Sequence, residues 1–260
     1  MFAFVHNQKT AGTSFKFILR NSFGLSQCDA NYIRNNPYTN KGLIFARKVF
    51  FSLKSITGHN IIEPTKHLKG DDILFLTFLR EPVMRCISHF QDTCLRGGNT
   101  LPFEEWILIE ENQNVQVKRI AGEFNSEKAI KLVRDRYFFV GLTERFEESI
   151  KLLKVISPYR LNLRYRKQVV ARDNTIKNEI LNDPSKMDLL KKYNQLDTEL
   201  YNYVSGDLFP GEIEKHIDEI SKVKLPEKPY NSEYILNYRM SIIFNKFVYK
   251  VLLKLFRKRG

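Results

Sequence analysis

A short polar loop near the start of the chain has the residue types that hold an anionic group. It follows an apolar run at residues 2–5 and precedes apolar residues at helical spacing in 14–20. The N-terminus of a helix offers backbone N–H groups to anions, and Lys, Thr and Ser side chains add donors there. The loop therefore predicts a phosphate site made by Lys9, Thr10, Ala11, Gly12, Thr13 and Ser14.

This loop differs from the nucleoside-triphosphatase loop. The pattern G-x-x-x-x-G-K-[ST] is absent, because Lys9 precedes the single glycine, Gly12. A purely structural alternative stays open, in which Gly12 makes a turn and Thr13 or Ser14 caps the helix.

A second segment suits another anionic group. Arg80 ends the apolar run 73–79, and Ser88 lies two helical turns beyond Pro82. Open α/β sheets bind ligands at the carboxyl ends of their strands, and the planar fork of an arginine matches a phosphate. We expect Arg80 and Ser88 to bind a second phosphate. The alternative is an Arg80–Glu81 surface pair that closes the strand.

The elements that must position these residues alternate between strands and helices. Apolar runs at 2–5, 73–79 and 137–142 predict strands, and residues 55–59 indicate a further short strand that ends at a glycine. Helical patterns occur at 14–20, from Pro82, over 103–120 in one or two pieces, from Phe146 and over 184–205. This alternation predicts an α/β fold, a single domain with a central parallel sheet flanked by helices. Residues 26–54 have no clear period, and a basic surface loop is expected at 164–172.

The two polar segments, in this order, resemble the cofactor-binding motifs of sulfotransferases that use 3′-phosphoadenosine 5′-phosphosulfate (PAPS). The first has the form H-x-x-K-T-A-G-T-S and the second T-x-x-R-x-P-x-x-R-x-x-S. The residues of these motifs are most similar to those of the carbohydrate branch, which includes the heparan sulfate and uronyl sulfotransferases. Further matching pieces extend the resemblance over residues 2–205: Thr57-Gly58-His59, Asn114 to Gly122, Val140 to Phe146, and Asn194 to Tyr201.

The resemblance implies a P-loop-NTPase-like sulfotransferase domain over residues 1–210, with PAPS as co-substrate and no metal. In that family the first motif holds the 5′-phosphosulfate and the second holds the 3′-phosphate. Lys9 then neutralises charge on the leaving phosphate, and the loop at 164–172 folds over the nucleotide. The reaction expected is transfer of the sulfuryl group to a hydroxyl of a glycan or lipid-linked saccharide.

A base must also take the proton of the acceptor hydroxyl. His59 follows a strand, and the matching Gly-His position supplies the catalytic base in the heparan sulfate enzymes. An imidazole with an ordinary pKa near ~6.5 is largely neutral at cytoplasmic pH. His6 is the competing candidate; it could instead orient the loop by hydrogen bonding or touch the acceptor.

Acceptor contacts are expected from residues near the cleft. A basic lining suits a uronate-bearing or sulfated sugar, although Arg85 could merely pair with Glu81, and Glu63 could be an exposed loop acid. The candidates are His6, Glu63, Arg85, Arg96, Gln116 and Arg119.

Composition narrows the partners and the compartment. The 260 residues hold 42 Lys and Arg against 29 Asp and Glu, a net charge of +13 that favours an anionic substrate or surface. No nucleic-acid module is recognisable. The three cysteines have no metal or redox spacing, and residues 1–12 form neither a signal peptide nor an anchor. A cytoplasmic, bacterial-type enzyme is expected, unlike the Golgi-anchored animal enzymes.

The C-terminal part, residues 211–260, is predicted to be a basic amphipathic helical extension. Residues 239–260 hold seven basic residues and no acidic one, and Lys246, Lys250 and Lys254 share one helix face. Such a helix can lie on an anionic bilayer but is too interrupted to span one. Packing of its apolar face onto the domain is the alternative.

Two other functions stay open from the sequence alone. A nucleotide-dependent kinase is disfavoured by the missing Walker spacing and by the lack of a metal-binding acid after a strand. A non-catalytic anionic-glycan binder would show steeply salt-dependent binding without sulfate transfer.

Overall fold

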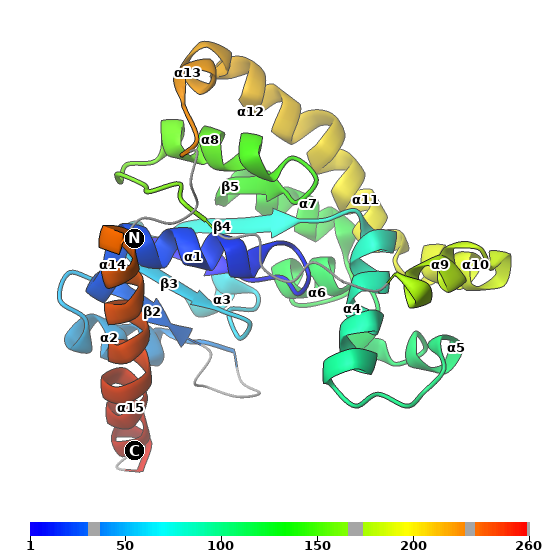
Figure 1. Ribbon diagram of the computed structural model, residues 1–260, viewed down its shortest axis with the longest axis horizontal. Coiled ribbons are helices and arrows are strands. Elements are labelled where there is room, and N and C mark those ends of the chain that lie inside the picture. The colour runs from blue at the N-terminus through cyan, green and yellow to red at the C-terminus, as the bar shows by residue number, and fades with distance from the viewer. Residues whose placement is uncertain (31–36, 166–173, 227–231, 259–260) are drawn as a thin grey trace.

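A five-stranded parallel sheet organises the computed structural model, which describes residues 1–30, 37–165, 174–226 and 232–258 (Figure 1). For residues 232–235 and 257–258 only the backbone is described. The strand order is β2-β3-β1-β4-β5, and every pairing is parallel. The predicted α/β class with a central parallel sheet is therefore confirmed. The strands are β1 (Phe2–Val5), β2 (Gln27–Asp29), β3 (Ser55–Gly58), β4 (Leu74–Leu79) and β5 (Tyr137–Leu142).

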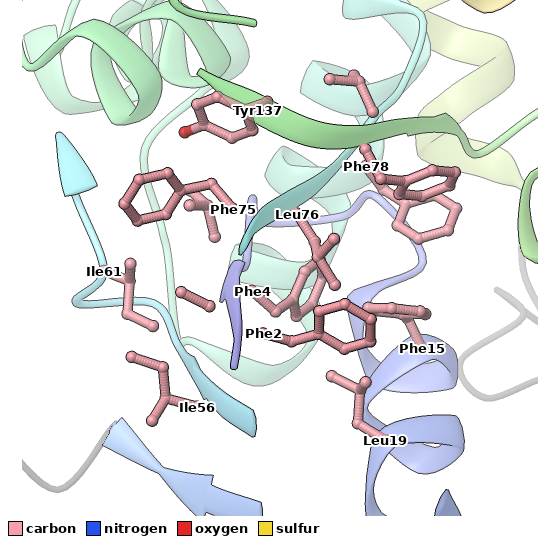
Figure 2. Close-up of a cluster of buried hydrophobic side chains, with 14 of the residues drawn as sticks. Phe2, Phe4, Phe15, Leu19, Ile56, Ile61, Phe75, Leu76, Phe78 and Tyr137 are labelled. Atoms are coloured by element: carbon pink, nitrogen blue, oxygen red, sulfur yellow. The ribbon is translucent and has the colours of Figure 1, made fainter. Parts of the chain in front are cut away.

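The central strands are apolar on both faces because helices cover both faces. Phe2 and Phe4 of β1 are fully buried, and Figure 2 shows them between Leu76 of β4 and side chains of helix α1 (Gly12–Phe23). The Phe4 ring meets the Phe15 ring edge-on, with 4.7 Å between their centroids. This aromatic cluster fixes α1 against the sheet, and so fixes the loop that precedes α1.

The crossover direction changes beside β1. Helix α1 leaves β1 toward β2, whereas the chain that leaves β4 runs through α6 (Val115–Ala121) and α7 (Ser126–Asp135) toward β5. Because crossovers are right-handed, α1 and the α6–α7 pair lie on opposite faces, as Figure 1 shows. The carboxyl ends of β1 and β4 therefore flank a topological switch point, where open α/β sheets bind ligands.

The other helices extend this framework. A second, smaller apolar cluster joins α4 (Pro82–Arg96) and α5 (Phe103–Trp106) to α9 (Thr175–Leu181) and α10 (Pro184–Tyr193). The remaining elements, in chain order, are η1 (Gly24–Ser26), α2 (Asn40–Val49), α3 (Pro64–His67), η3 (Glu110–Asn112), α8 (Phe146–Ile156), α11 (Gln195–Tyr203), η4 (Val204–Leu208), α12 (Phe209–Lys215), α13 (Ile217–Lys222), α14 (Ser232–Ile243), η5 (Phe244–Tyr249) and α15 (Lys250–Lys258).

The C-terminal helix, α14–η5–α15, covers the edge strand β2. The buried Asn245 amide donates to the Gln27 carbonyl at 2.8 Å, and its oxygen accepts from the Asp29 backbone N–H at 2.7 Å. One side chain thus replaces the neighbouring strand that β2 lacks on this side. Tyr249 and Leu253 join the main core on the same helix face. The boundary predicted at residue 210 lies inside α12. The C-terminal helix is packed on the domain through Asn245, Tyr249 and Leu253.

Several elements lay outside the sequence-based prediction, among them β2, α2, α3, α7 and α9. Residues 26–54, which have no clear period, contain β2 and α2, and both are completed by residues from the C-terminal helix. The helical stretch predicted over 103–120 is divided into α5, η3 and α6.

Candidate functional site

The two polar segments singled out from the sequence line a single cleft of about 680 Å³. It lies at the carboxyl ends of β1, β4 and β5, at the switch point of the sheet. Every residue predicted to bind the cofactor contributes to its wall: Lys9, Thr10, Ala11, Gly12, Thr13, Ser14, Arg80 and Ser88, together with His6. The structure therefore brings together residues that are about 70 positions apart in the sequence.

The first loop is held in an unusual backbone conformation. Lys9 and Ala11 both have positive φ, 65° and 56°, which turns successive backbone groups in different directions. Ala11 is the N-cap of α1 and has no side-chain oxygen to accept from the first-turn amides, and that turn holds no acidic residue. The start of α1 therefore has the open, electropositive character that suits an anion. The alternative in which Thr13 or Ser14 is the capping residue is wrong, because both lie inside α1 and its N-cap is Ala11.

Hydrogen bonds fix this loop to the sheet. The Asn7 amide donates to the Thr77 hydroxyl at 3.1 Å and to the Phe78 carbonyl at 3.2 Å, both on β4. The Thr10 hydroxyl donates to the Asn7 carbonyl at 3.1 Å. These buried contacts hold the loop rigid without using the groups at the start of α1.

Gly12 is required by a close approach rather than by a positive φ. A Cβ atom built on Gly12 would lie 2.0 Å from two atoms of the His6 imidazole. That imidazole is nearly fully buried and stacks on Phe4. Any larger residue at position 12 would have to displace the His6 ring from the base of the loop.

Arg80 joins the two halves of the cleft. Its guanidinium donates to the Lys9 carbonyl at 3.1 Å. Its backbone is held by the buried Gln116 side chain, which accepts from the Arg80 N–H at 2.9 Å and donates to the Arg80 carbonyl at 3.0 Å. Gln116, predicted to contact an acceptor, instead positions Arg80 in this structure.

Helix α4 brings Ser88 to the same cleft. Its N-cap is Glu81, whose carboxylate accepts from the Val83 N–H at 3.0 Å and the Met84 N–H at 2.7 Å. The alternative in which Arg80 and Glu81 form a surface pair therefore does not describe Glu81, which is committed to the helix start.

The Lys9 ammonium is paired with a carboxylate from α4. Its Nζ lies 3.2 Å from Oδ1 of Asp92, which also pairs with Arg96 at 3.4 Å. Arg96, a candidate for acceptor contact, thus pairs with Asp92 and is 61% exposed. Both Lys9 and Asp92 retain some exposure, so the pair is open to competition from a bound anion.

His59 lies directly after β3 and stacks on His6, with 3.9 Å between the ring centroids. Its Nδ1 is 3.0 Å from the His6 carbonyl oxygen. A carbonyl only accepts, so Nδ1 carries the proton and Nε2 is the unprotonated nitrogen. Burial, and secondarily Arg119, lowers the pKa of His59 to about 4, so its imidazole is neutral at pH 7. His59 does not line the cleft itself, whereas His6 does.

The predicted acceptor contact by Arg85 does not fit the structure. Its side chain is 0% exposed, with Nε 3.8 Å from Oδ2 of Asp197 and a terminal nitrogen 3.3 Å from Oδ1 of Asn194. Asp197 also accepts from the backbone N–H groups of Gln116 and Val117. Arg85 therefore neutralises the buried carboxylate that holds the start of α6, and so supports Gln116 beneath Arg80.

Arg119 and Glu63 also lie outside the cleft wall. The Arg119 guanidinium donates to the His59 carbonyl, and burial lowers its pKa to about 10. Glu63 pairs with Lys66 at 3.3 Å and Lys128 at 3.2 Å, and its carboxylate fills the space beside Gly122. Arg119 thus positions His59. Glu63, whose side chain is 14% exposed, is an ion-pair partner rather than an exposed loop acid.

The segment after β5 completes the cleft, although only the resemblance, and no chemistry of its residues, had marked it. The signal that could have found it is its place, since it follows a third parallel strand whose end meets the other two. Tyr165 donates to Glu147 at 2.7 Å and meets the Phe146 ring edge-on at 5.0 Å. The additional wall residues are Thr143, Glu144, Arg145, Phe146, Glu147, Glu148 and Tyr165.

Part of the predicted basic loop lies outside the described residues. Of 164–172, only Arg164 and Tyr165 are described, so the prediction that Arg166, Lys167 and Arg172 fold over a nucleotide stays a prediction. In the described part of the chain, no three His, Cys, Asp or Glu side chains gather as metal ligands. None of the described helices combines the length and apolar character needed to cross a bilayer.

Comparison with family models and with curated proteins finds no match for this chain. The interpretation therefore depends on the chemistry of the cleft.

Proposed function

We propose that the cleft binds PAPS and that the protein is a sulfotransferase acting on a hydroxyl of a carbohydrate. The observation that carries the proposal is the meeting of two separate anion-binding groups in one cleft. One is the first loop with Lys9 and the start of α1, and the other is Arg80 with Ser88. A nucleotide with phosphates at both its 5′ and 3′ positions has two anionic groups to match them.

Other residues of the cleft suit the nucleobase end of such a nucleotide. Phe146 and Tyr165 give the cleft an aromatic part, and the Glu144 and Glu147 carboxylates beside them can accept hydrogen bonds. Aromatic faces stack on nucleobases, and carboxylates accept from exocyclic amino groups. In this proposal the cationic loop binds the phosphates, and the aromatic residues bind the nucleobase.

Lys9 and the start of α1 have the electrostatic role in this proposal. The co-substrate, when bound, supplies an activated sulfuryl group on its 5′-phosphate. Negative charge grows on that phosphate during transfer, and a fixed ammonium and helix N-terminus stabilise it without reorganisation. Lys9 must exchange Asp92 for the anion, which its partly exposed position permits.

His59 is the proposed base; it lies behind the wall residue His6, on which it stacks, and is only partly buried. Its depressed pKa keeps it neutral, and the His6 carbonyl fixes the tautomer that leaves Nε2 to accept the proton of the acceptor hydroxyl. His6 packs between Phe4 and His59 over Gly12, which suits a positioning role for its ring. The carbohydrate acceptor itself rests on the resemblance of the sequence to the carbohydrate branch, because Arg85 and Arg119 do not line the cleft.

A transfer assay tests the proposal. The protein is incubated with radiolabelled PAPS and unsulfated uronate polysaccharides, heparosan and chondroitin, and in parallel with labelled ATP and Mg²⁺. We expect label transfer from PAPS without added metal, and a large loss in Lys9→Ala and His59→Ala. Phosphate transfer from ATP that depends on Mg²⁺ would favour a kinase and contradict the proposal.

Two controls separate catalysis from simple binding. Lys131→Ala removes an exposed lysine on α7, away from the cleft, and should leave transfer unchanged. Salt-dependent retention of the polysaccharides without any transfer from PAPS would identify a glycan-binding protein instead.

A further inference from the structure

The C-terminal helix has a second apolar face that the domain does not cover. Ser241, Asn245, Tyr249 and Leu253 form its buried seam, whereas Leu236, Met240, Ile243, Phe247, Val251 and Leu255 are exposed at spacings of three or four residues. That spacing gathers them into one stripe on the side opposite the seam. Phe247 is 62% exposed, an unusual position for a large aromatic side chain. Packing on the domain thus accounts for only one of the two faces.

Helix α2 and the turn after it enlarge this surface. Phe45 of α2 stacks on Phe256 of α15 with centroids 4.5 Å apart, and Phe50 meets Phe244 at 5.1 Å. Next to these contacts, Ile44 is exposed and Phe51 is 93% exposed. We call the exposed residues Ile44, Phe51, Phe247, Val251 and Leu255, with the lysines around them, the α2–α15 surface.

The charge around this surface has one sign. Residues 37–62 contain Lys41, Arg47, Lys48 and Lys54 and no acidic residue, and residues 239–260 contain no acidic residue either. Arg47 is neutralised by Asp72 at 2.6 Å, whereas Lys48, Lys54, Lys246 and Lys254 are exposed. Exposed apolar side chains bordered by lysines match an apolar layer under anionic headgroups.

A second copy of this chain is a poorer match. Joining two copies through the same face would bring the two sets of lysines together, and like charges across an interface oppose association. We propose that the α2–α15 surface docks the protein on an anionic lipid bilayer, with Phe51 and Phe247 inserted at the headgroup boundary and the lysines over anionic headgroups.

This surface is separate from the candidate cleft. The C-terminal helix contacts the last turns of α1, where Tyr238 packs on Phe17 at 4.5 Å and Asn237 donates to the Asn21 carbonyl. The cleft lies at the opposite end of α1, at Gly12. Docking therefore leaves the cleft open, and the proposal stands or falls independently of the sulfotransferase proposal.

Co-sedimentation of the full chain with vesicles tests the docking. We expect binding to vesicles of phosphatidylcholine mixed with phosphatidylglycerol, weak binding to phosphatidylcholine alone, and release by high salt. The double variant Phe247→Ser/Val251→Ser should lower the partition coefficient about tenfold or more, because it removes inserted apolar area. Lys246→Gln and Lys254→Gln should each lower it about fivefold.

Matched controls lie on the other side of the molecule. Leu95→Ser removes a side chain as exposed as Phe247, at 61%, from α4, and Lys191→Gln removes an exposed lysine from α10. Both should bind vesicles like the wild type. The proposal is overturned if the double variant also binds like the wild type, or if the controls lose as much. It is equally overturned if the wild type ignores anionic vesicles and forms a dimer in ultracentrifugation that Phe247→Ser/Val251→Ser dissociates.

Discussion

The edge of β2 and the start of α1 both present backbone hydrogen-bonding groups, and this chain treats them in opposite ways. At β2, Asn245 reaches from the C-terminal helix and pairs with Gln27 and Asp29. At α1, the N-cap is an alanine in the left-handed region, and the helix start faces a cleft of about 680 Å³. At the β2 edge the backbone groups are paired by a protein side chain, whereas the N-cap of α1 beside the cleft makes no side-chain hydrogen bond to the first turn.

The side chains around the two places differ in the same way. Asn245 is fully buried and belongs to the structure, and its removal should act on stability. Lys9 is partly exposed, has a surface carboxylate as partner, and adds little to stability. The contrast predicts that substitutions at the cleft and at the edge have separable effects.

The largest expected effect is that of Lys9→Ala on the transfer rate. Losing a fixed cation at the leaving phosphate should lower kcat by about 10²–10³. Thermal unfolding should change little, because a surface ion pair contributes about 0–1 kcal/mol. Single-turnover transfer from labelled PAPS measures the first quantity and calorimetric melting the second. An unchanged rate in Lys9→Ala would remove the electrostatic role from this residue.

Asn245→Ala should have the converse effect. It leaves the Asp29 N–H and the Gln27 carbonyl without their partner in a buried place, which should lower the free energy of unfolding by about 3 kcal/mol. Urea denaturation measures this loss, and nucleotide binding by the folded variant should be retained. Asn237→Ala, an exposed position on the same helix, is the control with an expected loss below about 1 kcal/mol. Equal losses in the two variants would show that the edge is not covered as described.

The pH dependence of kcat/KM tests whether the buried environment of His59 lowers its pKa. Because burial and Arg119 lower the pKa of His59 to about 4, the neutral base should persist as the pH falls from 7.5 to 5.5. The value of kcat/KM should stay nearly constant over that interval, whereas a base with an ordinary pKa near 6.5 would lose about tenfold.

Stability has to be checked in the same range. Unfolded His59 takes up a proton below about pH 6.5, whereas folded His59 does so only near 4, so the free energy of unfolding falls with falling pH between these values. Enzyme returned from pH 5.5 to 7.5 should recover full activity. A reversible tenfold loss at pH 5.5 would contradict the environment described for His59.

Asp92→Asn should have the smallest effect. Asp92 competes with a bound anion for the Lys9 ammonium at 3.2 Å, so removing its charge should tighten nucleotide binding by up to about fivefold. Isothermal calorimetry with 3′-phosphoadenosine 5′-phosphate (PAP) measures the change. Weaker binding in Asp92→Asn would mean that the carboxylate positions Lys9 for the anion rather than competing with it.

The parts of the fold that depend on local pattern were predictable. β1, β4 and β5 are apolar runs, β3 is a short strand that ends at a glycine, and the loop before α1 and the turn after β4 are marked by their own residues. Their convergence in one cleft follows from parallel topology, which places all carboxyl ends at one edge. The cleft residues of the first loop, together with Arg80 and Ser88, could therefore be named from sequence alone.

The parts that depend on distant partners were not predictable. β2 is three residues long, and its outer edge is completed by Asn245, which lies more than 200 residues later. Arginine is usually a surface residue. Arg85 is buried because it pairs with Asp197, and no local sequence pattern links these two residues. Gln116 and Arg119 became positioning residues for the same reason, since their partners Arg80 and His59 come from other strands.

The most direct test of the cleft is whether it recognises the 3′-phosphate through Arg80. Calorimetry compares PAP with AMP on the wild type, on Arg80→Ala and on Arg134→Ala, an exposed arginine of α7. The wild type and Arg134→Ala should bind PAP about 10–100-fold more tightly than AMP, the contribution expected of a charge-assisted pair. Arg80→Ala should lose that preference and keep its affinity for AMP. Equal binding of PAP and AMP by the wild type, or an equal loss of both in Arg80→Ala, would contradict the account.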